Sequence, residues 1–125
     1  MTPSLAGRKV VQAAVTVTDL GRAVSFYRDT LCLPLLFETN GMLFFQTGDV
    51  RLLVGLNPHG APSDASALYF DAPDIDTLRP ALEARGVVFE EATEVLQKTA
   101  THELKLALFR DPDGNLLGLL GEVPV

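Results

Sequence analysis

The segment VVQAAVTVTDLGRAVSFYRDTLCLPLLFE, residues 10–38, decides how the first half of this 125-residue chain folds. It opens with residues 10–17, in which small or polar residues alternate with apolar ones. A period of two is that of a β-strand with one buried face. The other face of this predicted strand carries Gln12, Ala14 and Thr16, and it can line a cavity or meet water.

A helix is predicted directly after this strand. Thr18-Asp19 is a good N-cap pair. Apolar residues follow it at helical spacing, namely Leu20, Ala23, Val24, Tyr27 and Leu31. We expect the helix to end near Leu31 or Cys32, because Pro34 disfavours helix in the residue before it. Cys32 stands where a terminating glycine is usual, so a positive φ is expected there.

Three more strands complete a first module, which spans about residues 8–57. They are predicted at residues 35–37, 42–46 and 50–56, with Asn40-Gly41 and Gly48-Asp49 as the turns between them. Residues 58–64 are rich in proline, glycine and polar residues and have no periodicity, which indicates a linker.

The same series then repeats in a second module, at about residues 65–122. Asp74 is expected to cap a helix that Gly86 ends, and Pro80 indicates that this helix starts late or has an irregular first turn. Strands are predicted at residues 67–72, 87–90, 104–109 and 116–120, with a turn at residues 111–115 between the last two. The chain is therefore an α+β protein, a single domain over residues 1–125 built from two tandem βαβββ modules.

Composition excludes several functions. The net charge of −6 argues against nucleic acid as a partner, since a phosphate backbone is repelled by such a surface. No apolar run is long enough to span a bilayer, and no secretory signal is recognised, so we expect a cytoplasmic protein without a membrane partner. One cysteine, Cys32, rules out an internal disulfide and a cysteine-based zinc site.

Residues 10–38 resemble the first strand and helix of the vicinal oxygen chelate superfamily, which comprises glyoxalases, bleomycin resistance proteins and extradiol dioxygenases. The closing segment LALFRDPDGNLLGLL, residues 106–120, is similar to the final hairpin of that family. The resemblance covers nearly the whole chain and identifies it as a small two-module member. It implies curved mixed sheets that enclose a concave cavity, and frequently a homodimer.

In metal-dependent members of this family, four positions on the sheet faces bind one divalent ion. The resemblance places them here at Gln12, Leu53, Ala67 and Gly118, and only Gln12 is a residue that the family uses. One amide with Leu, Ala and Gly does not hold a divalent ion, which needs about three or four strong donors. We therefore predict no cofactor and no metal at these positions, although a divalent ion bound by other residues stays open. His59 is expected to be an exposed loop residue of the linker.

The strand pattern predicts the lining of a pocket without a metal. The candidate ligand-binding residues are Gln12, Thr16, Arg51, Leu53, Ala67, Tyr69, Asp71, His102 and Gly118. His102 and Tyr69 are weak catalytic candidates, His102 because it opens a strand facing inward or at a rim. Apolar walls with a few polar groups are typical of small-molecule sites.

The leading hypothesis is a protein that binds a small organic molecule in the sheet cavity without a metal. The alternative is a lyase or dioxygenase-type enzyme of the same superfamily with a non-standard or absent metal site. A third hypothesis is a regulatory or purely structural partner, since exposed sheet edges suit a homodimer.

Overall fold

The computed structural model describes residues 4, 6–8, 11–56 and 67–125. In the first half of the chain, one strand and one helical segment precede three antiparallel strands. They are β1 (Gln12–Val17), α1 (Leu20–Val24), the π-helical turn η1 (Ser25–Thr30), β2 (Leu35–Thr39), β3 (Met42–Thr47) and β4 (Val50–Leu56). The sheet has the order β1-β4-β3-β2, and β1 runs parallel to β4.

The second half repeats this topology. Its elements are β5 (Ala67–Asp71), α2 (Ile75–Ala84), β6 (Glu94–Lys98), β7 (His102–Arg110) and β8 (Leu116–Pro124). The sheet order is β5-β8-β7-β6, with β5 parallel to β8. The predicted α+β architecture of two βαβββ modules is therefore confirmed.

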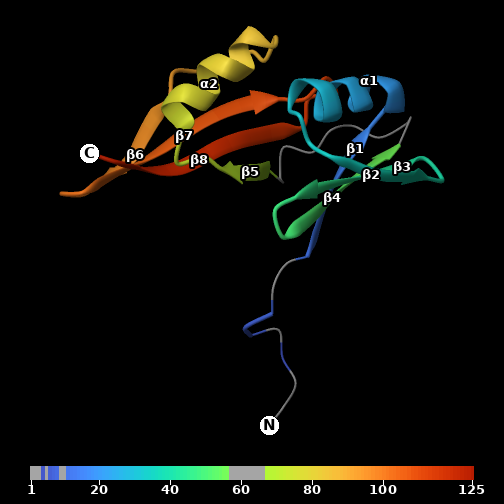
Figure 1. Ribbon diagram of the computed structural model, residues 1–125, viewed down its shortest axis with the longest axis horizontal. Helices are drawn as coiled ribbons and strands as arrows, with labels where there is room; N and C mark the ends of the chain where they lie inside the picture. Colours follow the sequence, from blue (N-terminus) through green and yellow to red (C-terminus); the bar gives the residue numbers. More distant parts are fainter. Residues whose placement is uncertain (1–3, 5, 9–10, 57–66) are drawn as a thin grey trace.

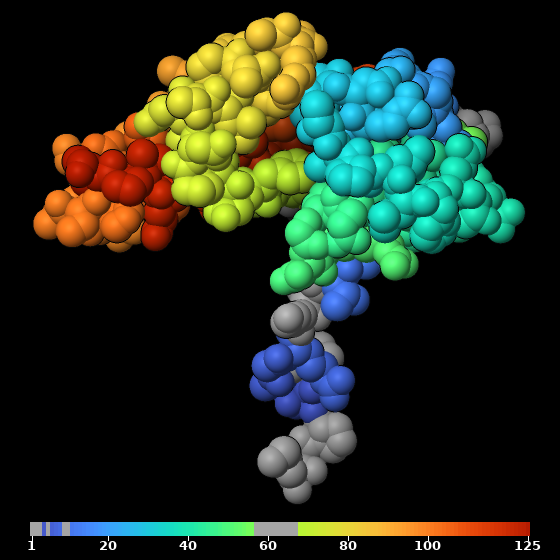
Figure 2. All heavy atoms as spheres, viewed as in Figure 1, coloured from blue at the N-terminus to red at the C-terminus, as the bar shows by residue number. Residues whose placement is uncertain are grey.

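Both modules share one layered arrangement, because α1 and α2 lie on the same side of the two sheets (Figure 1). The halves meet along a seam between the cyan-to-green first module and the yellow-to-red second module (Figure 2). Apolar side chains from both modules form one buried cluster beneath the helices, which includes Tyr27 and Phe45 from the first and Phe109 and Leu119 from the second. The ring centroids of Phe26 and Phe109 lie 6.5 Å apart across the seam.

The turn between β7 and β8 joins the second module to the first. The Asn115 side chain donates a 2.7 Å hydrogen bond to the carbonyl of Thr16. The buried hydroxyl of Tyr27 donates a 2.8 Å bond to Oδ2 of Asp111. Asp113 accepts a 3.0 Å bond from the Arg22 guanidinium. The Asp-Pro-Asp-Gly-Asn sequence is thus both a turn and the joint between the modules.

The predicted strand at residues 87–90 is wrong. Phe89 makes only an isolated bridge to Phe109, and the edge strand of this sheet is β6 instead. Val87 and Phe89 are buried in the core, and Val88 between them is exposed. This period of two is the same as that of a strand with one buried face, although the segment forms no strand. All five residues of β6 are exposed, so β6 has no alternation that a sequence pattern can detect.

The helix boundaries follow the predicted signals, with one exception. Cys32 has a φ of 62° and Gly86 a φ of 99°, as expected of residues that end helices. Helix α2 starts at Ile75, directly after Asp74, so of the two alternatives predicted from Pro80, a late start or an irregular first turn, the late start does not occur. Pro80 lies inside the helix, and Asp74 occupies the N-cap position without a side-chain hydrogen bond to the helix.

The linker at residues 58–64, and with it His59, lies outside the described residues. Over residues 11–56 and 67–125, no helix has the length and apolar character needed to cross a membrane.

Candidate functional site

The outer face of the first sheet, the face turned away from the helices, gathers the first group of candidate residues. The parallel pairing of β1 with β4 sets Gln12 opposite Arg51, and the next pairs on this face are Ala14–Leu53 and Thr16–Gly55. All six residues therefore share one face, as the alternation in the sequence predicts. Gln12, Thr16 and Arg51 are exposed there, and Leu53 is half-buried.

Two phenylalanines extend this outer face, and sequence reasoning missed them. Phe37 of β2 pairs with Phe44 of β3, which in turn pairs with Leu53. The two rings are stacked with their centroids 4.4 Å apart, and the Arg51 guanidinium carbon lies 5.9 Å from the Phe37 centroid and 5.8 Å from that of Phe44. The register of β2 shifts between Leu35 and Phe37, so simple alternation does not show which face Phe37 occupies.

The outer face of the second sheet gathers the remaining candidates. Tyr69 pairs with Gly118 and Asp71 with Leu120, while Ala67 stands opposite Leu116. A Cβ atom at Gly118 would lie 2.8 Å from Cδ1 of Tyr69, so this ring lies against the backbone of β8. The absence of a side chain at Gly118 is what admits the ring. Half-buried Leu104, Leu106 and Leu108 of β7 continue this face.

The two catalytic candidates of the second sheet lie at opposite ends of it. His102 pairs with Pro124, whereas Tyr69 pairs with Gly118, six residues away along β8. Since a strand rises about 3.3 Å per residue, these positions are about 20 Å apart. His102 is exposed, and its Nδ1 lies 2.9 Å from the Thr101 hydroxyl. The two side chains do not act on one small substrate within a single copy of the chain.

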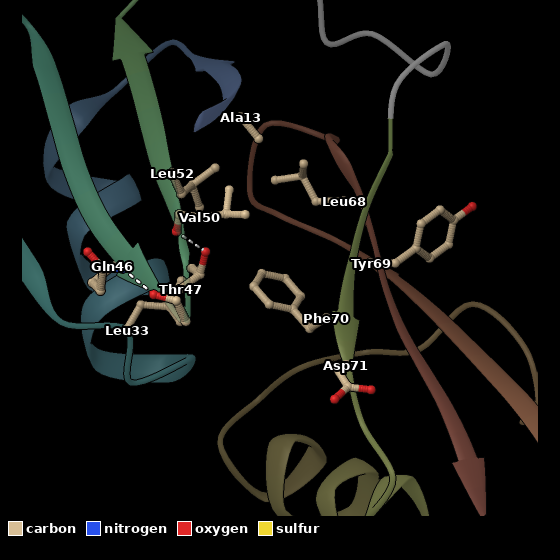
Figure 3. A pocket seen from close by; sticks show the side chains of 11 residues that line it. Ala13, Leu33, Gln46, Thr47, Val50, Leu52, Leu68, Tyr69, Phe70 and Asp71 are labelled. Atoms are coloured by element: carbon tan, nitrogen blue, oxygen red, sulfur yellow. Dashed lines mark hydrogen bonds between the residues drawn. The ribbon is translucent and has the colours of Figure 1, made fainter. Parts of the chain in front are cut away.

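A hollow of about 480 Å³ lies at the seam, on the helix side of the sheets. Leu68 and Phe70 of β5 point into it toward Val50 and Leu52 of β4, and Tyr69 points to the other side (Figure 3). Of the predicted site residues, only Tyr69 and Asp71 border it. Gln12, Thr16, Arg51 and Leu53 belong to the opposite face.

Two of the polar side chains around this hollow, those of Gln46 and Thr47, are engaged within their own hairpin. Thr47 donates a 2.5 Å hydrogen bond from its hydroxyl to the carbonyl of Val50. The Gln46 amide donates to the carbonyl of Gly48. The rest of the lining is mainly apolar. The hollow therefore has room for a small molecule but offers few polar groups to orient one.

The four positions that the fold associates with a divalent ion do not fit one. Gln12 offers a neutral amide, Leu53 a hydrocarbon, Ala67 a methyl group, and Gly118 no side chain at all. The Tyr69 ring lies against Gly118. Elsewhere in the described part of the chain, no three His, Cys, Asp or Glu residues come together as a metal site. Divalent ions need such donors, so no chemical step is assigned to a metal here.

Two ionisable groups at the joint between the modules, Tyr27 and Asp113, have perturbed pKa values. Burial raises the pKa of the Tyr27 phenol, and the neighbouring Asp111 carboxylate raises it further. Burial by itself raises the pKa of Asp113. Hydrogen bonds from Thr18 and the Arg22 guanidinium outweigh that effect and lower the pKa below its ordinary value. Tyr27 of the first module contacts Asp111 of the second, and Asp113 of the second module contacts Thr18 and Arg22 of the first. Both groups therefore stabilise the contact between the modules and do not belong to the outer faces.

The paired βαβββ modules define the class of protein, and the sequence comparison defines the family. The pattern of the Glyoxalase/Bleomycin resistance protein/Dioxygenase superfamily matches residues 9–119. The chain belongs to this superfamily.

Three similar proteins illustrate the match. The uncharacterized protein YraH of Bacillus subtilis (strain 168) is 27% identical over 124 residues, which cover 87% of this chain and 94% of YraH. A putative glyoxalase family protein from Bacillus anthracis has the same fold, with a TM-score of 0.81 and 16% identity over 98% of this chain and 99% of that one. TnmS3, an antibiotic binding protein from Streptomyces sp. CB03234, is 27% identical with a TM-score of 0.71, over 95% of this chain and 99% of that one.

Proposed function

We propose that this protein binds a small organic molecule on the outer faces of its sheets, without a metal. The observation that carries the proposal is the register that sets Gln12, Thr16, Arg51 and Leu53 on one exposed face. This face combines apolar area with a few polar groups, which is the composition of a ligand site. The similarity to TnmS3, an antibiotic binding protein, supports binding as opposed to turnover.

We further propose that the binding unit is a homodimer. In the described part of the chain, each sheet leaves one face uncovered by helices (Figure 1). Both faces carry apolar side chains, Phe44 and Leu53 on one and Leu104 and Leu106 on the other. A second copy that sets one face over the other encloses a cavity and removes apolar area from water. The single thiol, Cys32, agrees with a reducing compartment such as the cytoplasm, and this location stays a prediction.

A thermal-shift screen tests the proposal. The protein is heated with Zn²⁺, Ni²⁺, Mn²⁺ or Fe²⁺, and separately with methylglyoxal–glutathione adducts, catechols and cationic antibiotics. We expect an organic molecule to raise the Tm, since a ligand at 100 times its Kd adds about 2.7 kcal/mol to stability. The metal ions are expected to leave the Tm unchanged.

Two variants locate the ligand. Leu53→Glu places a charge in the middle of the outer face and is expected to abolish the shift caused by the ligand. Val88→Glu is the matched control, because Val88 is 81% exposed and lies outside both sheets. A stoichiometric metal in the purified protein, lost in Gln12→Ala, would overturn the proposal. That result would favour the lyase or dioxygenase alternative.

A further inference from the structure

We propose that the outer face of the first sheet selects a planar aromatic molecule that carries a carboxylate. Its ring stacks against the Phe37–Phe44 pair and its carboxylate binds the Arg51 guanidinium. This inference rests on the proposed binding function and names the class of ligand.

Phe37 and Phe44 form an aromatic surface on the outer face of the first sheet. The Phe37 and Phe44 rings are stacked at 4.4 Å with 21° between their planes, and Phe37 is 45% exposed. The exposed ring of Phe37 and the half-buried ring of Phe44, held nearly parallel by neighbouring strands, offer a flat apolar surface that a third ring can continue. A planar ligand removes this surface from water without rearranging the rings.

Arg51 differs from most cationic side chains of the described residues in having no carboxylate partner. Six cationic side chains of the described residues lie within 4.0 Å of a carboxylate, namely Arg22, Arg28, Arg79, Lys98, Lys105 and Arg110. Arg51 contacts no carboxylate in the described part of the chain, although the protein has 16 Asp and Glu residues. It lies near two rings instead, at about the limit of a cation–π contact. Its N–H groups are therefore available to an anion.

The cross-strand neighbours of Arg51 carry no charge. The residues directly opposite it on the two adjacent strands are Gln12 and Gln46, which are neutral amides. Among the described residues, no carboxylate next to Arg51 on this face competes for the guanidinium, and Gln12 brings N–H donors of its own. A planar guanidinium can donate two parallel N–H hydrogen bonds to the two oxygens of a carboxylate. The Phe37 and Phe44 rings together with the Arg51 guanidinium therefore favour a ligand that is both aromatic and anionic.

Isothermal titration calorimetry with three matched probes tests the inference. The probes are 2-naphthoate, its neutral amide 2-naphthamide, and the cation 2-naphthylmethylammonium. We expect naphthoate to bind about tenfold or more tightly than the amide, which is the usual gain from a charge-assisted hydrogen bond. The cation is expected to bind most weakly.

Four variants assign the effect to residues. Arg51→Gln is expected to remove the preference for naphthoate over naphthamide while the amide still binds. Phe37→Leu is expected to weaken both probes about three- to tenfold, because a stacked ring is lost. The controls are Arg85→Gln, at an exposed arginine in the second module, and Val95→Ala, at an exposed residue of β6. Both should bind the three probes as the natural chain does.

The outcomes separate the two proposals. Equal affinity for naphthoate and naphthamide, or a preference for naphthoate that survives Arg51→Gln, overturns the inference that the ligand is an aromatic carboxylate. Either result leaves the proposed binding of an organic molecule on this face intact. A change in dimer dissociation with Arg51→Gln, without any change in probe affinity, also overturns it, since Arg51 then serves the second copy. If no organic molecule shifts the Tm in the screen described above, the proposed function itself fails.

Discussion

Tyr27 contributes both a buried ring and a hydroxyl that links the two modules. Its hydroxyl donates a 2.8 Å bond to Asp111, and its ring centroid lies 5.7 Å from that of Phe45. Tyr27→Phe keeps the ring and removes only the hydrogen bond. We expect a loss of about 1–2 kcal/mol in the free energy of unfolding, measured by urea denaturation.

Tyr69→Phe is the control for this measurement, because Tyr69 is 54% exposed. Its stability should stay within about 0.5 kcal/mol of the natural chain. An equal loss in both variants would contradict the assignment of Tyr27 to the joint.

Asp113 gives the joint a dependence on pH. Its pKa is lowered in the folded protein, so the folded state binds fewer protons than the unfolded state near that pKa. The stabilisation is present above the unfolded pKa of about 3.9 and is lost as the pH falls through the lower folded value. We expect urea midpoints to fall more steeply below pH 4 in the natural chain than in Asp113→Asn.

Asp71→Asn serves as the control, since Asp71 is an exposed residue of β5. Its acid profile should follow that of the natural chain. A profile of Asp113→Asn that also matches the natural chain would show that Asp113 does not carry this part of the acid response.

At the scale of elements, the close approach of β8 to the end of β5 depends on Gly121. A Cβ atom there would lie 1.8 Å from the carbonyl oxygen of Ala72 and 2.3 Å from its carbon. These are backbone atoms, so they cannot swing aside as a side chain does. We expect Gly121→Ala to destabilise the protein by about 3 kcal/mol or more.

Gly55→Ala is the matched control, because Gly55 is also a strand glycine and a Cβ there meets nothing within 4 Å. It should be neutral or stabilising by about 0.5–1 kcal/mol, since alanine restricts the unfolded chain. Thermal unfolding of both variants checks the contrast.

Elements also differ in how far sequence patterns predict them. The first strand and helix were predictable because alternation, the Asp19 cap and Pro34 agree, and Asp19 accepts a 3.0 Å bond from the Arg22 N–H. Strand β6 was not predictable, because an exposed edge strand with a register shift near Val95 has no buried face to impose a pattern.

At the scale of the whole molecule, two apolar sheet faces have no helix over them in the part of the chain that the structure describes, which is the basis of the proposed dimer. Leu106→Lys places a charge on the outer face of the second sheet. We expect it to shift the protein from dimer to monomer in size-exclusion chromatography with light scattering, at concentrations where the natural chain has twice the mass of one copy.

Val88→Lys adds the same charge outside both sheets and should leave the dimer intact. A natural chain that is monomeric at all concentrations would contradict the dimer.

The resemblance to the superfamily pointed to the four positions without metal-binding groups, Gln12, Leu53, Ala67 and Gly118. Taken by itself, the sequence determined the duplicated βαβββ order and the face that Gln12, Thr16, Arg51 and Leu53 share. These follow from local rules, since alternation, caps and turns act between near neighbours. Only the tertiary structure decided that Phe37 and Phe44 stack beside Arg51, that His102 and Tyr69 lie at opposite ends of a sheet, and that a hollow lies at the seam. Such contacts depend on strand register and on how the modules pack, and a local pattern carries no information about either.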